Sequence, residues 1–240
     1  MDNIMHYLES FSFHSDIWGS VDLQPRLEKI SASYSSYDSA EIVCSVTSQK
    51  GKINAEIFFS SISNCEHVEI FRLLLNIILA DIRNLKYTIS LNTPDSVVKN
   101  LSQFFKIFEC NPQQKIALEL NERNIDHLTE TDFNTLNSIN NFSNIFLWLD
   151  DFGTGQSNFE IVISKKISFS AIKVSKELFW ELFSSDKKFL QSLLIYLGKR
   201  HKVVVEGVCS TKHFDFLSQI NNVFMQGFIF MHKDEFVLND

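Results

Sequence analysis

The sequence predicts an α/β fold, a (β/α)8 barrel, from three observations. Short apolar runs typical of buried strands alternate with stretches of helical periodicity along the chain. The length of 240 residues suits one such barrel, and a hydrophobic content of 45% supplies a large core. The alternative is an open doubly wound sheet, but no Gly-x-Gly-x-x-Gly motif follows the first strand to support a dinucleotide fold.

The expected strands are short, apolar and bounded by polar or turn-forming residues. They are Val21–Gln24, Ala40–Val46, Tyr87–Leu91, Ile116–Leu120, Ile145–Leu149, Ala171–Val174, Val203–Val205 and Val223–Phe230. The expected helices have apolar residues at helical spacing. They are Ala55–Ile62 with Val68–Arg83, Pro94–Phe108, Glu130–Ile139, Asn158–Ile163, Lys176–Leu197 and Thr211–Ser218. No linker-like stretch divides the chain, so we expect residues 1–20 to form an N-terminal extension and residues 21–240 a single domain.

Composition narrows the class of protein further. The net charge of -7 argues against binding to polymeric nucleic acid. The four cysteines lack the spacing of a zinc site, which predicts reduced, mostly buried thiols in a cytoplasmic protein. No basic segment precedes an apolar block near Met1, and no apolar run approaches the ~18 residues of a membrane span. We therefore expect neither a signal peptide nor a membrane anchor.

One apolar stretch ends in two adjacent acidic residues. The apolar run Phe146–Leu149 ends in two adjacent carboxylates, Asp150 and Asp151, and a Gly153-Thr154-Gly155 turn follows. Two charges at the end of a buried strand are costly unless a cation meets them. On this segment alone, an active-site edge and a solvated Asp-Asp-Gly turn fit equally well.

Other polar residues stand at or near the carboxyl ends of expected strands, where a parallel barrel builds its active site. They are Asn92, Glu119, Lys173, Glu206 and Gln226, and Glu41 is a further candidate although it begins its apolar run. Two carboxylates about 4 Å apart repel by roughly 4 kcal/mol at an effective dielectric constant near 20. The converging carboxyl groups must therefore be protonated or hold divalent cations. Carboxylate and amide oxygens suit Mg²⁺ or Mn²⁺, and two such ions can clamp a phosphodiester.

This ordered set of motifs resembles the EAL-domain cyclic di-GMP phosphodiesterases of bacterial signalling. The segment Leu149–Gly155 matches the signature loop of the family, and the name-giving Glu-Ala-Leu triplet is similar to Glu41-Ile42-Val43. Further matches follow in the family's order. They are Ser90–Asn92, Leu118–Glu122, Ile172–Val174, Val205–Val208 and Gln226–Phe228. The likeness extends from about Val21 to Phe230.

The resemblance implies a modified TIM barrel whose first strand, Val21–Gln24, runs antiparallel to the others. It also implies roles for the site residues. One metal ion is held by Glu41, Asn92, Glu119 and Asp150, and a second by Asp151. Catalysis involves Lys173, Glu206 and Asp151, and substrate binding involves Gln24 and Gln226. Glu122 is expected to support the loop that follows Asp151.

The implied activity is hydrolysis of cyclic di-GMP to linear pGpG with Mg²⁺ or Mn²⁺, by a homodimer in the bacterial cytoplasm. Such an enzyme would favour motility over biofilm formation. Three positions depart from the family pattern, where Ser45, Ser175 and Cys209 replace an Arg and two acidic residues. Two alternatives therefore stand beside the enzyme. One is an inactive protein that binds a regulatory protein partner, and the other is a receptor that binds cyclic di-GMP without cleaving it.

Overall fold

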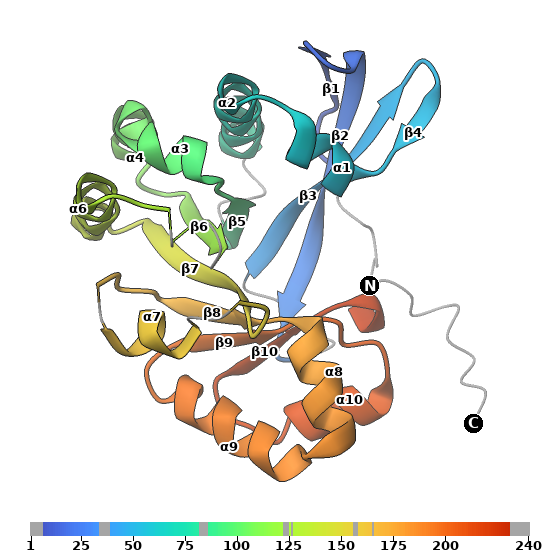
Figure 1. Ribbon diagram of the computed structural model, residues 1–240, viewed down its shortest axis with the longest axis vertical. Coiled ribbons are helices and arrows are strands. Elements are labelled where there is room, and N and C mark those ends of the chain that lie inside the picture. Colours follow the sequence, from blue (N-terminus) through green and yellow to red (C-terminus); the bar gives the residue numbers. More distant parts are fainter. Residues whose placement is uncertain are drawn as a thin grey trace.

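A computed structural model describes residues 7–33, 39–81, 86–121, 125, 127–155, 158–164 and 166–230. Within these residues, ten strands form one sheet (Figure 1). In spatial order, the strands are β1 (Phe11–Ser15), β2 (Gly19–Ser31), β10 (Val223–Gln226), β9 (Lys202–Val205), β8 (Ala171–Val174), β7 (Ile145–Phe152), β6 (Lys115–Asn121), β5 (Thr88–Asn92), β3 (Ser39–Ser48) and β4 (Gly51–Ile53).

The sheet closes into a barrel because β2 also pairs with β3. Eight strands form the closed ring, since β1 and β4 lie outside it. Strand β2 is antiparallel to both of its ring neighbours, β3 and β10, whereas the other neighbours in the ring are parallel. The predicted barrel with a reversed first strand is therefore confirmed.

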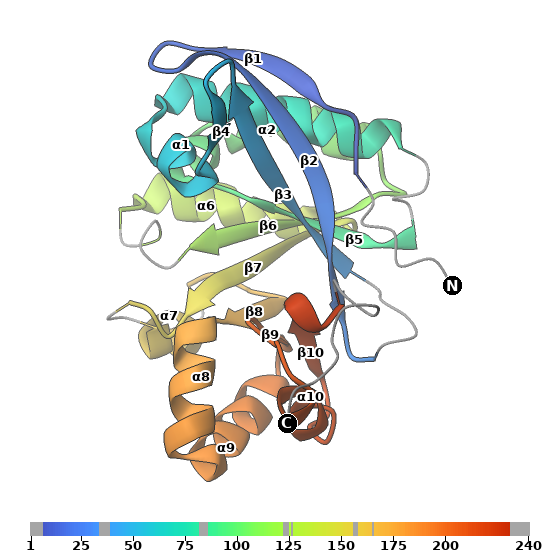
Figure 2. The ribbon, with the colours of Figure 1, turned by 90° about the vertical axis from the view of Figure 1, so that its right-hand side faces the viewer.

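Strand β2 is much longer than the predicted Val21–Gln24. It pairs with β3 in one continuous register from Val21 opposite Ser48 to Ile30 opposite Ser39. Figure 2 shows this long ribbon rising away from the other barrel strands, with β1 and β4 beside its far end. The predicted strand ended at Gln24, before Pro25, and neither β1 nor β4 was predicted. Pro25 is tolerated because it lies between the stretches of β2 that pair with β1 and β10.

The path of β3 explains the unusual position of Glu41. Strand β3 pairs with β5 only from Ser39 to Glu41 and then continues alongside β2 and β4 to Ser48. The part of β3 that belongs to the parallel barrel therefore ends at Glu41. Glu41 lies at the carboxyl end of the barrel although it is the third residue of its strand.

Helices cover the outside of the barrel (Figure 1). They are α1 (Ala55–Ser61), α2 (Asn64–Ala80), α3 (Asp95–Lys99), η2 (Leu101–Phe104), α4 (Phe105–Cys110), α6 (Glu130–Ser138), η3 (Ile139–Asn141), α7 (Asn158–Ser164), α8 (Lys176–Ser185), α9 (Lys187–Gly198), α10 (Thr211–Leu217) and η4 (Phe228–Phe230). In the part of the chain described above, no helix combines the length and apolar character required to cross a bilayer.

Three predicted elements are interrupted. The helix expected over Pro94–Phe108 breaks at Asn100, where ψ is 10° and a 3-10 turn begins. The helix expected over Lys176–Leu197 breaks at Asp186, whose backbone is not helical and whose carboxylate caps α9 by accepting the Phe189 N–H at 2.9 Å. The strand expected over Val223–Phe230 ends at Gln226, because Gly227 follows with a φ of 147°.

Two apolar cores hold the barrel. The larger lies mainly between the strands and the helices, and the smaller fills the barrel interior. The cysteines contribute little to either core, since Cys65 and Cys110 are exposed and Cys44 and Cys209 are half-buried. The expectation of mostly buried thiols was therefore wrong.

Candidate metal centre

The candidate site lies directly above the small interior core. That core contains one residue from each of five strands, namely Ile30, Ala117, Trp148, Ala171 and Val204. Side chains two residues apart on a strand share a face. The polar residues two positions further toward the carboxyl end of the barrel therefore also point inward. They are Glu28, Glu119, Asp150, Lys173 and Glu206.

Lys173 is the centre of this group. Its side chain is 1% exposed, and its Nζ lies 2.9–3.1 Å from oxygens of four different carboxylates. The four are Glu41 at 3.0 Å, Glu119 at 3.1 Å, Asp150 at 2.9 Å and Glu206 at 2.9 Å. They come from β3, β6, β7 and the end of β9, so the closed barrel is what brings them together.

Two amide side chains complete the surroundings of Glu41. The Asn92 Nδ2 donates to Glu41 Oε1 at 2.9 Å, and the Gln226 Nε2 donates to Glu41 Oε2 at 2.7 Å. The Gln226 amide also lies 3.4 Å from an oxygen of Glu28. Each of these amides leaves its carbonyl oxygen for another partner. An amide oxygen beside a carboxylate is a suitable ligand for a hard cation.

Asp151 lies at the edge of the same group. The register between β7 and β8 shifts after Leu149, and Asp151 has a φ of 57°, in the left-handed region. A non-glycine residue in that region is uncommon and is concentrated at functional sites. This backbone places one oxygen from each of Asp150, Asp151 and Glu206 within 4.8 Å of one another. Asn121 on the neighbouring β6 donates a hydrogen bond to Asp151.

The burial of so many acids perturbs their pKa values. Burial raises the pKa of Glu119 well above its ordinary range, and the negative charges of Glu41 and Asp150 outweigh the opposing effect of Lys173. Burial likewise raises the pKa of Glu206 to about 7. The carboxyl groups resist ionising together at neutral pH, which is the sign of a site with too few cations.

Lys173 and Glu41 show the opposite behaviour. Burial alone would lower the pKa of Lys173, but four carboxylates, beginning with Asp150 and Glu119, raise it well above its ordinary value. Burial alone would raise the pKa of Glu41, but the charge of Lys173 and the hydrogen bond from Gln226 lower it. Lys173 therefore stays protonated and Glu41 stays ionised near neutral pH.

The donor set fits divalent metal ions. Four carboxylates around one ammonium group leave three negative charges without a counter-charge when all are ionised. The available ligand atoms are carboxylate and amide oxygens, which suit hard cations such as Mg²⁺, Mn²⁺ and Ca²⁺. Glu119 and Asp150 come from adjacent strands and both face the barrel axis. The site therefore has the charge and the ligand chemistry to hold divalent cations.

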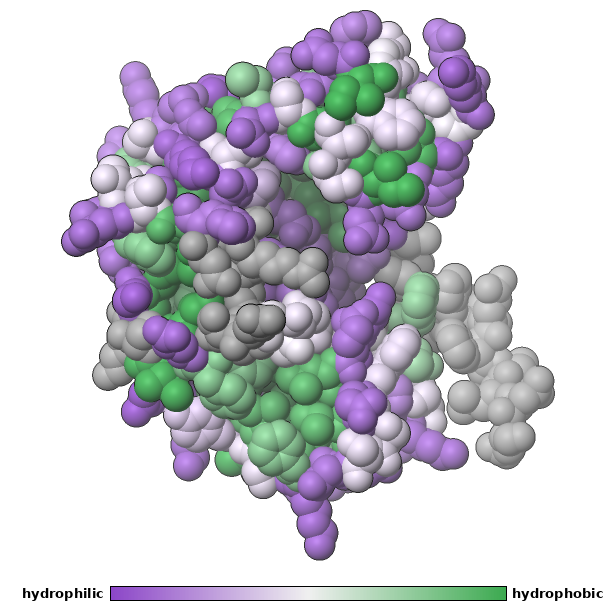
Figure 3. Space-filling model, viewed as in Figure 1, coloured by the Kyte–Doolittle hydropathy of each residue, from purple (hydrophilic) through white to green (hydrophobic). Residues whose placement is uncertain are grey.

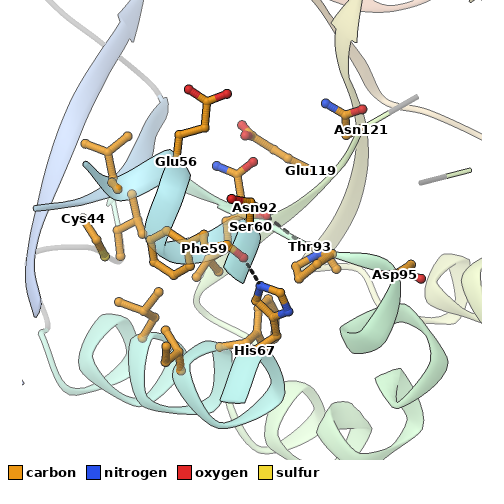
Figure 4. Close-up of a pocket in the computed structure, with 18 residues that line it drawn as sticks. Cys44, Glu56, Phe59, Ser60, His67, Asn92, Thr93, Asp95, Glu119 and Asn121 are labelled. Carbon is orange, nitrogen blue, oxygen red and sulfur yellow. Dashed lines mark hydrogen bonds between the residues drawn. The ribbon is translucent and has the colours of Figure 1, made fainter. Parts of the chain in front are cut away.

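A cavity of about 610 Å³ adjoins the carboxylates on the side of α1 and α2. Figure 4 shows the polar ends of Asn92 and Glu119 near Glu56 at one side of the cavity, with Phe59 and His67 beyond them. His67 contacts the Phe59 carbonyl oxygen at 2.8 Å. The cavity is large enough for a small organic group and is mostly apolar beyond the carboxylates.

The structure therefore brings together most of the residues singled out from the sequence. They are Glu41, Asn92, Glu119, Asp150, Asp151, Lys173, Glu206 and Gln226. Gln24 lies apart from them, and its amide donates to the Leu8 carbonyl at 2.9 Å. Glu122 lies outside the described residues.

The three departures from the family pattern have identifiable contacts. Ser45 accepts a hydrogen bond from Arg26 at 3.1 Å. Ser175 caps α8 by accepting the Leu178 N–H, and the Cys209 Sγ lies 3.8 Å from His213. None of the three belongs to the group around Lys173.

Sequence reasoning missed Arg26, Glu28 and Asn121. Arg26 and Glu28 form an ion pair of 2.9 Å on the inward face of β2. The alternation of apolar and polar residues from Val21 to Glu28 is the pattern of a strand with one polar face. This pattern could have placed Arg26 and Glu28 on that face. Asn121 directly follows the last residue of the predicted strand Ile116–Leu120.

Comparison with known proteins identifies relatives of the chain. "Probable cyclic di-GMP phosphodiesterase PdeD" of Escherichia coli (strain K12) is 28% identical over 138 residues, which is 56% of this chain and 24% of that protein. "Cyclic di-GMP phosphodiesterase PdeH" of the same organism is 43% identical over 65 residues, which is 26% of this chain and 25% of that protein. Each alignment thus spans only about a quarter of the relative.

A solved structure of the Bacillus subtilis YkuI protein, which has an EAL domain and was solved in complex with cyclic di-GMP and calcium, shares the fold. Its TM-score is 0.69 at 17% identity, over 87% of this chain and 55% of YkuI. The sequence pattern of the EAL domain matches residues 18–233, which include every described residue of the candidate site. The closed barrel, its reversed first strand and this match together show that the chain belongs to the EAL domain family.

Proposed function

We propose that this protein is a metal-dependent phosphodiesterase that hydrolyses cyclic di-GMP to linear pGpG. The observation that carries the proposal is the buried group of four carboxylates around Lys173, with Asp151 at its edge. The names of the relatives PdeD and PdeH and the ligand of YkuI support this choice of substrate. An apolar cavity beside the carboxylates offers space for a nucleobase.

Two divalent cations, Mg²⁺ or Mn²⁺, would supply Lewis-acid activation of the phosphate and of the attacking water. Glu41, Asn92, Glu119 and Asp150 would hold one ion, and Asp151 would contribute to the second. Glu41, Glu119 and Asp150 are buried, which limits the access of bulk water to them and favours a pre-organised site.

Lys173 and Glu206 act on the water and the phosphate. Because its raised pKa keeps Lys173 protonated, it donates hydrogen bonds and does not act as a base. It orients the attacking water and offsets negative charge beside the phosphate. Glu206, which lies 2.9 Å from Lys173, positions the same water and takes up its proton as the water oxygen bonds to phosphorus. The bond from phosphorus to the 3′-oxygen breaks, and that oxygen leaves and takes a proton from solvent. Gln226, which lies beside Glu41, and Gln24, which lies further along β2 and apart from the carboxylates, would bind different parts of the substrate. Glu122 would support the loop after Asp151.

We further propose a homodimer that uses the face around α7. This helix follows the Asp150–Gly155 segment directly and exposes Phe159 and Ile163. Figure 3 shows an apolar region over α7 and toward α8 and α9. Burying such side chains against a second copy would link the dimer contact to the metal centre. A molar mass of a single chain in solution would contradict this assignment.

A second candidate is a protein of this family that binds a regulatory protein partner and has little or no catalysis. Ser45 and Cys209, which stand where the family has an Arg and a Glu, favour it. A receptor that binds cyclic di-GMP without cleaving it is the third. An effect in the cell that survives Glu41→Ala would favour the protein partner. Tight binding in Ca²⁺ without turnover in Mn²⁺ would favour the receptor.

The test is a product assay. The purified protein is incubated with cyclic di-GMP and Mn²⁺ or Mg²⁺, and pGpG is quantified by chromatography. We expect pGpG from the wild type and a loss of about 100-fold or more for Asp151→Asn. Asp215→Asn, at an exposed position on α10, is the matched control and should retain full activity. Folded wild-type protein that makes no pGpG would refute the proposal. An active enzyme would lower cyclic di-GMP in the bacterial cytoplasm and favour motility over biofilm formation.

A further inference from the structure

The long strand β2 carries a row of polar side chains toward the site. Gln24, Arg26 and Glu28 alternate with buried apolar residues, so they share one face. Across the ladder, Arg26 is paired with Val43, and Glu28 with Glu41. Same-face neighbours on a strand are about 6.6 Å apart. Arg26 therefore lies one such step beyond Glu28 and Glu41, on the part of the ribbon that extends past the barrel.

The guanidinium of Arg26 is held by two contacts. Its Nη2 donates to Glu28 Oε1 at 2.9 Å, and its Nη1 donates to the Ser45 hydroxyl at 3.1 Å. Glu28 is in turn contacted by Gln226, whose amide also donates to Glu41. A continuous chain of polar contacts thus connects Arg26 to a candidate metal ligand. Because both ends of the chain are on rigid strands, the position of the guanidinium is fixed relative to the carboxylates.

Arg26 differs from Lys173 in how completely its charge is matched. Lys173 is enclosed and surrounded by four carboxylates, whereas the side chain of Arg26 is 26% exposed and is paired with one carboxylate. A guanidinium has five N–H donors, and the contacts to Glu28 and Ser45 use two of them. Arg26 therefore retains donors and charge for an anionic ligand.

We propose that Arg26 binds the phosphate of cyclic di-GMP that is not under attack. This inference rests on the proposed function. Cyclic di-GMP is a ring with two phosphodiester groups, so a molecule with one phosphate at the carboxylates presents the other some ångströms away. A guanidinium matches two phosphate oxygens in a bidentate contact. Arg26 on β2 thereby supplies a guanidinium beside Ser45 on β3, the position at which the family pattern has an Arg.

If Arg26 contacts the phosphate that does not react, its removal should affect KM and kcat differently. Such a contact is equally strong before and during the reaction, so its loss should raise Kd and KM but leave kcat nearly unchanged. Removing one hydrogen-bonded charge from a phosphate should weaken binding about 10- to 100-fold. Binding should also become less sensitive to salt, because one opposite-charge contact is missing.

The experiment compares wild type, Arg26→Ala, Arg26→Lys and the double variant Arg26→Ala/Ser45→Arg. Arg72→Ala is the matched control, since Arg72 lies on α2 and contacts Gln103 and Phe104 away from the carboxylates. Kd for cyclic di-GMP is measured by calorimetry in Ca²⁺ at several KCl concentrations. KM and kcat are measured in Mn²⁺, and thermal unfolding is followed for each variant.

We expect Arg26→Ala to raise Kd and KM about 10- to 100-fold with kcat within about threefold of wild type. Arg26→Lys should give a smaller rise of about 3- to 10-fold, because it keeps the charge and loses the bidentate contact. The double variant should recover much of the affinity, since it supplies a guanidinium from the facing strand. Arg72→Ala should match the wild type.

A Kd for Arg26→Ala within about twofold of wild type and of Arg72→Ala would overturn the role of Arg26 and leave the proposed function intact. If Arg26→Ala does not fold, Arg26→Lys decides, and wild-type affinity in that variant would overturn the role. Wild-type protein that binds no cyclic di-GMP in Ca²⁺ and makes no pGpG in Mn²⁺ would instead refute the proposed function, and with it this inference.

Discussion

Replacing Lys173 with methionine should convert the site into a group of mutually repelling carboxylates. Each Nζ–oxygen contact of 2.9–3.1 Å contributes about 5.5 kcal/mol of attraction at an effective dielectric constant near 20, or about 22 kcal/mol together. Four ionised oxygens spread around one nitrogen lie about 4.9 Å apart, and their six repulsions sum to about 20 kcal/mol. The attraction to the ammonium group thus offsets the whole repulsion among the carboxylates.

The variant will not retain that full repulsion, because carboxyl groups will take up protons instead. We therefore expect Lys173→Met to lower the free energy of unfolding by about 3–5 kcal/mol at pH 8 in the presence of a chelator. Burial already raises the pKa values of Glu119 and Glu206, and the loss of the ammonium charge that opposes this rise leaves both further above their unfolded values. Their contribution to stability is then fully present below the unfolded pKa and is lost as the pH rises through the folded pKa. The variant should accordingly be less impaired at pH 5.5 than at pH 8.

Urea unfolding at the two pH values, with chelator and with Mn²⁺, measures this effect. Lys176→Met is the matched control, because Lys176 is exposed at the start of α8. Mn²⁺ should restore part of the stability lost in Lys173→Met, since it supplies cationic charge to the same carboxylates. A Lys173→Met variant as stable as Lys176→Met at pH 8 without metal would show that the ammonium group does not hold the carboxylates together.

Three further outcomes follow from the same geometry. Burial raises the pKa of Glu206 to about 7 without metal, so Mn²⁺ must displace a proton from this carboxyl group at pH 6. Calorimetry should therefore show that the affinity for Mn²⁺ rises toward pH 8, and an affinity independent of pH would contradict this. Burial alone would raise the pKa of Glu66, but hydrogen bonds from Ser63 lower it to about 2. In urea unfolding, Glu66→Gln should therefore lower the free energy of unfolding by about 1 kcal/mol above pH 4.5, and by progressively less as the pH falls toward 2. Gly153→Ala should lower the unfolding free energy by about 2–3 kcal/mol, because Gly153 has a φ of 108° and an added Cβ would clash with the Leu178 side chain of α8. Gly19→Ala, with a φ of 67° and open space around the added Cβ, should cost about 1 kcal/mol, and equal losses in urea unfolding would argue against the steric explanation.

Much of the site could be predicted because parallel strands place their carboxyl ends together. Glu119, Asp150, Lys173 and Glu206 each follow an apolar run, so the rule for barrels gathers them without knowledge of exact register. Glu41 did not follow the rule. Strand β3 continues past the barrel alongside β2, so the end of its parallel part at Glu41 cannot be recognised from the length of the apolar run.

The parts that escaped prediction depend on pairing between distant residues. The predicted strand ended at Gln24, so Arg26 and Glu28 fell outside it. A proline cannot donate to a ladder, and Pro25 therefore gives no local sign that the strand continues. Only the antiparallel register of β2 with β3 places Glu28 opposite Glu41. The break at Asp186 had a local signal, a capping residue after two serines, which the continuous apolar pattern on either side obscured.

If the carboxylates around Lys173 hold divalent cations for hydrolysis, a crystal structure grown with Mn²⁺ should show the ions in anomalous diffraction data. We expect two manganese peaks, one within about 2.5 Å of oxygens of Glu119 and Asp150 and the other bound by Asp151. An ordered site without anomalous peaks at saturating Mn²⁺, or with manganese only at surface carboxylates elsewhere, would contradict it.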